Sequence, residues 1–170
     1  MIEIISAERD RIKDIQSVSA VAWPHAFKDI LSASQIVYMM NWMYSDEGLS
    51  DQIEKKKHRY FIAQSDGENV GYLSIEHNCE QTGKTKIHKL YILPERQKKG
   101  IGKLLIEKAA QEAKRMQDMA IYLNVNKYNE NAIAFYKRLG FFLAKEEIID
   151  IGNGFVMDDF VFELQLTSNE

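Results

Sequence analysis

A run of cations followed by two glycines is the first segment in which residue types and spacing suggest chemistry. Arg96, Lys98 and Lys99 precede Gly100 and Gly102, and an amphipathic pattern begins directly afterwards. Glycine has no Cβ, so an anion can approach the backbone N–H groups closely. The first N–H groups of a helix lack partners within it, and the helix dipole favours negative charge there. The segment therefore predicts an anion site that suits a pyrophosphate.

Two better-known phosphate motifs are excluded at this position. The dinucleotide fingerprint needs a third glycine where the chain has Leu105. The nucleoside-triphosphate loop needs Ser or Thr after Gly-Lys, and here Leu104 follows. What remains is the pattern Gln97-x-x-Gly100-x-Gly102 between a strand and a helix. Alone this pattern is weak, because solvated cations at an ordinary strand-to-helix turn explain it as well.

A second segment places a tyrosine on an expected helix. Asn129 is a good N-cap, and Gly140 suits the left-handed position that ends a helix. Ile133 and Tyr136 fall on one face between them. Taken alone, the segment indicates a core helix with one aromatic anchor.

Hydrophobic periodicity predicts the elements that must position these two segments. Strands are expected at residues 2–5, 60–64, 70–76, 86–93, 120–125, 141–149 and 155–166. Helices are expected from about residue 8 to 23, from 32 or 34 to 43, and over 101–116 and 129–139, with a short helical turn over 49–57. The resulting order, β-α-α-β-β-β-α-β-α-β-β, is that of a mixed α/β domain.

The first two helices have predicted caps and buried faces. Ser6 is the expected cap of the first helix, which Trp23-Pro24 should end. Ser32 or Ser34 is the expected cap of the second. The predicted buried stripes are Ile12, Ile15, Val18 and Val21 in the first helix, and Ile36, Val37, Met40 and Met43 in the second.

Length and composition narrow the class of protein. The chain has 170 residues, 45% of them hydrophobic, which suits one globular domain. No apolar run approaches the roughly 20 residues of a membrane span, and no signal peptide is recognised. Cys79 is the single cysteine, so we expect a cytoplasmic protein. A net charge of −3 argues against nucleic acid as a partner, and no membrane association is expected.

Together, in this order, the segments LYILPERQKKGIGKLL and NENAIAFYKRLGF resemble the GNAT superfamily of acyl-CoA N-acyltransferases. The resemblance covers residues 60–166 well and the N-terminal third loosely. It implies an α/β fold with a mixed, mostly antiparallel twisted sheet of about seven strands and about four flanking helices. The sheet should be splayed between its fourth and fifth strands. Residues 1–170 should form a single N-acetyltransferase domain.

The resemblance implies acetyl-CoA as co-substrate and assigns residues to it. The pyrophosphate should be held by the glycine loop and its cations, and the pantetheine arm by the backbone of the preceding strand. Three asparagines and a tyrosine should complete the site from the following strand and helix. The implied residues are Gln97, Lys98, Lys99, Gly100, Ile101, Gly102 and Lys103 in the loop, Leu90, Tyr91 and Ile92 in the strand, and Asn124, Asn129, Asn131 and Tyr136 beyond them.

The chemistry of acetyl transfer explains why these groups are needed. An amine has a pKa around 10 and must lose a proton before it can attack the thioester. The oxyanion that forms needs a fixed donor, for which the resemblance suggests the N–H of Ile92. The leaving thiolate has a pKa near about 8.5, so a phenol can protonate it. Tyr136 matches the tyrosine that the resemblance places by the thioester sulfur, so it is the expected general acid.

The general base is left open between two residues. Glu76 and His88 both lie near strands that should border the acceptor site. Each also has an ordinary alternative, as a solvated strand end for Glu76 and a surface histidine for His88. No cluster of His, Cys or Asp has the sequence spacing of metal ligands, so no metal is predicted.

The acceptor is expected to be a small cationic amine. The segment GNGFVMDDFVFEL resembles the end of bacterial polyamine acetyltransferases, and Asp158 and Asp159 within it could bind a cation or could simply be solvated. A protein N-terminus, as in ribosomal-protein acetyltransferases, and an amino-sugar are alternative acceptors. A non-catalytic acetyl-CoA sensor is an alternative of another class. The sequence leaves the oligomeric state open, with a homodimer as one option.

Overall fold

The computed structural model describes residues 1–167, and within them it has seven strands and five α-helices. The strands are β1 (Ile2–Ala7), β2 (Arg59–Ser65), β3 (Glu68–Glu76), β4 (Lys84–Ile92), β5 (Ala120–Asn126), β6 (Phe142–Gly152) and β7 (Phe155–Gln165). The helices are α1 (Ile12–Phe27), α2 (Ala33–Met43), α3 (Asp46–Glu54), α4 (Ile101–Arg115) and α5 (Glu130–Arg138). None of the helices described within these residues is both long and apolar enough to cross a membrane.

The strands form one mixed sheet in the order β1-β2-β3-β4-β5-β7-β6. The pairing of β4 with β5 is parallel and joins Lys84–Ile87 to Ala120–Leu123, the first four residues of each strand. This limited parallel pairing is consistent with a splay between the fourth and fifth strands. The predicted fold class is therefore confirmed, with five helices in the described chain where about four were expected.

The chain divides into two compact units, which are described separately. The first unit comprises residues 1–76 and 88–109, and the second comprises residues 77–87 and the chain from Ala110 onward. The boundary therefore passes through β4 and through α4. The expected single domain over residues 1–170 stays a prediction.

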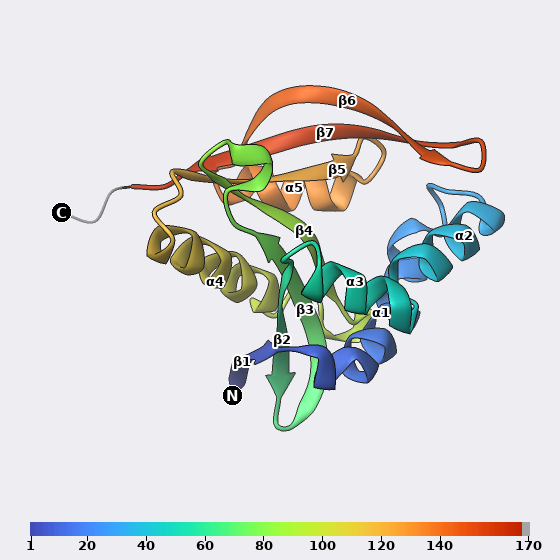
Figure 1. Cartoon of the computed structure of the whole chain (residues 1–170), viewed down its shortest axis with the longest axis horizontal. Coiled ribbons are helices and arrows are strands. Elements are labelled where there is room, and N and C mark those ends of the chain that lie inside the picture. The colour runs from blue at the N-terminus through green and yellow to red at the C-terminus, as the bar shows by residue number, and fades with distance from the viewer. Residues whose placement is uncertain (168–170) are drawn as a thin grey trace. The chain divides into compact units, whose positions relative to one another are not determined.

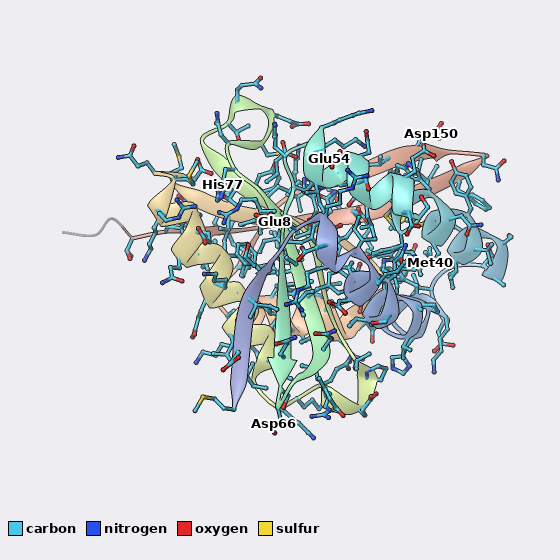
Figure 2. All side chains as sticks on the ribbon, turned by 60° about the horizontal axis from the view of Figure 1, so that its bottom comes forward. Glu8, Met40, Glu54, Asp66, His77 and Asp150 are labelled. Atoms are coloured by element: carbon cyan, nitrogen blue, oxygen red, sulfur yellow. The ribbon has the colours of Figure 1, made fainter. Side chains whose placement is uncertain are left out.

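In the first unit, α1 packs against β3. The register pairs β1 with β2 from Ile2 opposite Ser65 to Ala7 opposite Tyr60, and β2 and β3 form a long hairpin (Figure 1). Asp66 lies at the end of this hairpin (Figure 2). Ile15 of α1 is fully buried, and its truncation to alanine would cost roughly 2–5 kcal/mol of stability.

The first helix differs from the sequence prediction at both ends. Ser6 pairs with Phe61 in the sheet instead of capping, and Arg11 takes the N-cap position without a side-chain hydrogen bond. Pro24 lies inside α1, which continues to Phe27. A proline in the last turn removes a single hydrogen bond there, and the packing of the Trp23 ring on Phe27, with centroids 4.3 Å apart, offsets this loss.

The predicted buried stripes were correct only in part. Ile12, Ile15 and Val18 are buried in α1, but Val21 is half exposed and Ala22 is buried in its place. Steps of three residues lag behind the 3.6-residue period of the helix, so three steps after Ile12 the buried position lies one residue further along, at Ala22.

In α2 the predicted cap is right and the predicted face is wrong. The Ser32 hydroxyl accepts a hydrogen bond from the Gln35 N–H at 3.1 Å. Gln35 and Met39 are the buried residues, whereas Val37 is 60% exposed. A polar residue thus occupies a position of the inner face, which hydrophobic periodicity cannot foresee.

In the second unit, β7 lies between β5 and β6 and pairs with both in antiparallel fashion. Figure 1 shows β6 and β7 as a long paired ribbon. Asn129 caps α5 by accepting a hydrogen bond from the Ala132 N–H at 3.3 Å. Gly140 has a φ of +95°, so the predicted left-handed end of this helix is confirmed.

Candidate active site

The glycine loop lies between β4 and α4, as its sequence predicts. Gly100 has a φ of +82°, and a Cβ built there would meet no atom within 4 Å. The backbone at Gly100 is therefore open on the side where a side chain would otherwise stand. Ile101 begins α4 and is 2% exposed, which anchors the first turn of the helix in the core. The open loop and the anchored helix start fit the predicted anion site.

The lysines of the loop are exposed and available to an anion. Lys98, Lys99 and Lys103 are all exposed, and none of them forms a salt bridge within residues 1–167. Lys98 has a φ of +62°, a left-handed conformation that tightens the turn before the helix. Positive charge and unpartnered helix N–H groups thus occur in one segment of the first unit.

The end of β4 lies close to β3 because Gly71 of β3 has no side chain to separate them. A Cβ at Gly71 would lie 2.9 Å from the Tyr91 carbonyl oxygen and 3.2 Å from Cγ1 of Ile92. The Leu93 N–H donates to the Val70 carbonyl at 2.9 Å. The Gln97 side chain donates to the Ile92 carbonyl at 3.4 Å. These contacts fix the backbone of the predicted pantetheine strand, which includes Leu90.

The structure brings the two general-base candidates together. His88 Nε2 lies 2.9 Å from Glu76 Oε1. His58 Nε2 lies 3.3 Å from the same oxygen, and the two imidazole rings stack with centroids 3.9 Å apart. We call His58, Glu76 and His88 the histidine cluster. The sequence around His58 indicates no role for it, and only the fold brings it to Glu76, 18 residues further along the chain.

Tyr136 is buried on α5 in the second unit. Its ring packs edge-on to Phe135 and Phe141, with centroids 5.1 and 5.4 Å away. The Phe141 N–H donates to the Tyr136 carbonyl at 3.1 Å, which joins the helix end to the start of the next strand. The position of the ring is therefore fixed by packing, as a proton donor requires.

The three predicted asparagines are used in different ways. Asn129 is engaged as the N-cap of α5, and Asn131 is exposed in the first turn of that helix. The Asn124 side chain donates to Glu147 Oε2 at 2.7 Å and to Asp159 Oδ2 at 3.3 Å. Asn124 thus connects a carboxylate of β6 with one of β7, a role that the sequence did not predict.

Asn124, Glu147 and Asp159 form what we call the acidic cluster. Glu147 lies directly opposite Asp159 in the β6–β7 register. Asp159 is 4% exposed, and its Oδ1 is buried and accepts no hydrogen bond within the described residues 1–167. Burial, which outweighs the hydrogen bond from Asn124, raises the pKa of the Asp159 carboxyl above its ordinary value.

The neighbouring carboxylates are already paired with lysines. Lys127 Nζ lies 2.9 Å from Asp158 Oδ1, and Lys145 Nζ lies 3.2 Å from Glu147 Oε1. The hydrogen bond from Asn124 is the largest of the effects that lower the pKa of Glu147. Oδ1 of each predicted acceptor aspartate is buried without a hydrogen bond of good geometry in the described chain, but that of Asp158 lies beside Lys127. Asp159 is therefore the one of the two whose buried oxygen has no lysine partner within the described residues 1–167.

Lys89 is a buried cation that sequence analysis did not single out. Its Nζ donates to Gln52 Oε1 and to the Tyr60 hydroxyl, both at 2.8 Å. Nζ also lies 4.4 Å from the centre of the Tyr44 ring. Burial lowers the pKa of Lys89 to about 7, with a smaller effect from Lys56. Its position one residue after His88 gave no signal, because alternation along a strand cannot say which lysines are covered.

The predicted residues fall in both compact units. The glycine loop, the β4 backbone from Leu90 to Ile92, and the histidine cluster belong to the first unit. Tyr136, the three asparagines, Asp158 and Asp159 belong to the second unit. The predicted site residues are thus divided between the two units.

Comparison with known proteins agrees with these features. The chain is 32% identical over 129 residues to a 5-NmdU N-acetyltransferase of Pseudomonas phage PaMx11, covering 75% of this chain and 88% of that protein. It is 26% identical over 161 residues to the spermidine N(1)-acetyltransferase of Thermoplasma acidophilum, covering 92% and 96%. An uncharacterised N-acetyltransferase of Methanocaldococcus jannaschii is 35% identical over 86 residues, and the match covers 48% of this chain and spans 38% of the length of that protein.

A solved structure and a family model also match this chain. The crystal structure of PaiA N-acetyltransferase from T. acidophilum in complex with coenzyme A superposes with a TM-score of 0.81 at 23% identity, covering 97% of this chain and 99% of that one. The model of the acetyltransferase (GNAT) family matches residues 23–141. That match includes both the glycine loop and the helix of Tyr136. The chain therefore belongs to the acetyltransferase (GNAT) family and is a GNAT N-acetyltransferase.

Proposed function

We propose that this protein moves an acetyl group from acetyl-CoA to a primary amine of a polyamine. The observation that carries the choice of acceptor is the buried, unused oxygen of Asp159 beside Glu147. The acceptor attacks the thioester directly and passes through a tetrahedral intermediate. A single domain over residues 1–170 is part of this proposal, and the family match across residues 23–141 supports it.

Cofactor binding is assigned to the glycine loop. The backbone from Gln97 to Lys103 provides N–H donors at the start of α4, and the exposed Lys98, Lys99 and Lys103 add positive charge. The open space at Gly100 supports this role, because a phosphate needs to reach the backbone. The relative with coenzyme A bound in its crystal structure shares the fold.

The chemical step divides between named groups. Glu76 or His88 accepts the proton that the amine loses as it attacks the thioester carbonyl carbon. The N–H of Ile92 stabilises the oxyanion that forms. As the carbon–sulfur bond breaks, the thiolate takes a proton from the Tyr136 hydroxyl, and coenzyme A leaves as the free thiol. Tyrosinate then recovers its proton from water or from the base.

The acidic cluster is assigned to the acceptor. A buried carboxylate without a full set of hydrogen bonds is costly, and a cation beside it would remove that cost. A polyamine carries several ammonium groups, so one of them can bind to Asp159 and Glu147 while another reacts. The spermidine N(1)-acetyltransferase relative, which aligns over 92% of this chain, supports the same class of acceptor.

The test compares acceptors at equal concentration in a thiol-release assay. The panel contains spermidine, an aminoglycoside, an amino-sugar and a peptide with an N-terminal Ala or Ser. We expect spermidine to give the highest kcat/KM and its KM to rise with salt, because screening acts on charges beyond about 8 Å at physiological ionic strength.

Each of the other outcomes selects a different function. A peptide that is acetylated faster than every polyamine would identify a protein N-terminus as the acceptor. A higher kcat/KM for the amino-sugar than for spermidine would identify an amino-sugar as the acceptor. Binding of acetyl-CoA without thiol release from any amine would indicate a sensor and would contradict the proposal.

A further inference from the structure

The histidine cluster has a geometry that the acetyl-transfer chemistry does not require. His58 precedes β2, Glu76 ends β3, and His88 lies in β4, so the three residues come from neighbouring strands of the first unit. Both imidazole Nε2 atoms face the same carboxylate oxygen, at 3.3 and 2.9 Å. A general base needs one proton acceptor, whereas here three atoms that could each bind a metal ion lie close together.

We propose that the histidine cluster binds a divalent first-row transition ion, for which Zn²⁺ is the probe. The three ligand atoms all lie within 4.8 Å of one another. Zinc bonds of about 2.0–2.1 Å in tetrahedral geometry separate neighbouring ligands by roughly 3.3 Å. The two distances from Glu76 Oε1 are close to this value. The imidazole rings are stacked at 16°, so both would have to turn about their Cβ–Cγ bonds to direct their Nε2 lone pairs at one ion.

The donor set selects the kind of ion. Two imidazoles and one carboxylate suit Zn²⁺ and its neighbours, whereas Mg²⁺ and Ca²⁺ prefer oxygen ligands alone. Three protein ligands leave a fourth position open to water, as in zinc sites that are not purely structural.

The backbone around the cluster is fixed. The His58 N–H donates to the Gln52 carbonyl at 2.9 Å. The β2–β3 register pairs Arg59 with Ile75, which brings His58 opposite Glu76 one position further along. His58 is 9% exposed as a side chain, His88 20% and Glu76 26%, so the site is partly covered yet open to a small ion. Such preorganisation favours binding over a loose surface arrangement.

This inference departs from the sequence prediction of no metal. Positions 58, 76 and 88 have none of the short spacings by which metal motifs are recognised, and only strand pairing brings them together.

Binding is tested by isothermal titration calorimetry of the full chain with Zn²⁺, without coenzyme A or amine. We expect a one-to-one complex, with protons released in proportion to the fraction of imidazolium present, because a protonated ring must lose a proton before it can ligate. Proton release is read from titrations in two buffers of different ionisation enthalpy. Co²⁺ substitution should give the visible absorption bands of a four- or five-coordinate site.

Two variants separate this site from adventitious binding. His58→Ala removes one ligand and should weaken Zn²⁺ binding by more than about 100-fold, since even the loss of an outer partner costs 10–100-fold. His25→Ala removes an exposed histidine of α1 and should leave binding unchanged. If circular dichroism shows that His58→Ala is unfolded, His88→Asn serves as the second ligand variant.

The proposal is overturned if the wild-type chain binds no Zn²⁺, or if the folded ligand variants bind it as tightly as the wild type. A second readout rests on the proposed function. Because Glu76 or His88 serves there as the base, bound Zn²⁺ should inhibit acetyl transfer in the wild type and in His25→Ala but not in His58→Ala. Binding without inhibition would keep the metal site and contradict only the assignment of the base.

Discussion

Asp159 and Glu147 lie directly opposite each other on β7 and β6, and one amide, that of Asn124, donates to both. Two carboxylates on directly opposite residues of paired strands repel each other unless a cation or a proton lies between them. Glu147 has a lysine partner, whereas the second oxygen of Asp159 is buried and accepts no hydrogen bond within the described chain. The arrangement is therefore costly as it stands and would be relieved by a bound ammonium group.

The first prediction concerns the two neighbouring aspartates. Asp159→Asn should raise the KM for spermidine roughly 10-fold or more, because a hydrogen bond to a charged group contributes about 1.5–3 kcal/mol. Asp158→Asn is the matched control: it removes the same charge from the next residue, but that charge is paired with Lys127. Steady-state kinetics at saturating acetyl-CoA should show a changed KM for the first variant alone. Equal effects of both variants would indicate a general effect of charge.

The second prediction concerns the pH dependence of the same KM. Burial raises the pKa of Asp159, so this carboxyl takes up a proton at a higher pH than an ordinary aspartate does. The KM for spermidine should rise as the pH falls toward that pKa, because the protonated carboxyl no longer attracts a cation. The groups that face Asp159 are Glu147, Asp158, Lys86 and the Asn124 amide. In Asp159→Asn this rise should disappear, and its persistence there would assign it to another group.

The third prediction uses a matched pair of glycines. Gly100 and Gly67 have φ values of +82° and +85°, and a Cβ at either position would meet no atom within 4 Å. Substitution by valine should therefore cause a similar conformational cost at both, on the order of 1 kcal/mol or more. Only Gly100→Val should also weaken acetyl-CoA binding, since its Cβ would occupy the space assigned to the pyrophosphate. Calorimetric titration of both folded variants decides this, and equal affinities would remove the loop from the cofactor site.

The fourth prediction isolates the chemical step. Tyr136→Phe retains the ring that packs against Phe135 and Phe141 and removes only the hydroxyl. Loss of general acid catalysis should lower kcat roughly 10²–10⁴-fold, with little change in acetyl-CoA affinity. Single-turnover measurements and binding titrations separate the two quantities. An unchanged kcat would show that water protonates the thiolate or that another step limits the rate.

The fifth prediction concerns stability and Lys89. Its pKa is about 7 in the folded protein, against an ordinary value of 10.5. Between these values the unfolded chain binds more protons, so stability should rise as the pH increases from about 7 toward 10.5. Below about pH 7 the buried ammonium of Lys89 is charged, and burying that charge lowers the free energy of unfolding by its full amount, on the order of a few kcal/mol.

The substitution that tests this is Lys89→Met, which keeps the length of the side chain. The variant should be more stable than the wild type at pH 7 and should lose that advantage near pH 10, where the neutral wild-type amine keeps its hydrogen bonds to Gln52 and Tyr60. Urea denaturation at several pH values measures the difference. Lys28→Met, at an exposed position, should show no such trend. A constant difference for Lys89→Met across this range would mean that Lys89 stays charged.

Features that depend on neighbouring residues were predictable from the sequence. Asn129 and Gly140 begin and end α5 as expected, because capping and left-handed turns are local properties. The position of the glycine loop before α4 was also predictable, because the left-handed turn at Gly100 is a local property. The order of strands and helices followed from periodicity and from the family resemblance.

Features that depend on pairing between distant strands could not be predicted. Glu147 was missed because only the β6–β7 register places it opposite Asp159. His58 was missed because only the β2–β3 register places it beside Glu76. The end of α1 was wrong because packing of Trp23 on Phe27 outweighs the usual effect of Pro24. In each case tertiary contacts decide the outcome, and these are absent from any short segment of sequence.

Gly71 has a consequence for how this protein would respond to random mutation. Its missing side chain leaves room for the Tyr91 carbonyl, 2.9 Å from where a Cβ would stand. Even alanine there would push β3 away from the strand whose backbone is assigned to the cofactor. A mutational scan scored by activity would therefore rank Gly71 among the essential positions, although it has no side chain to react or to bind. Such a scan would be reporting the spacing between two strands and not a functional group.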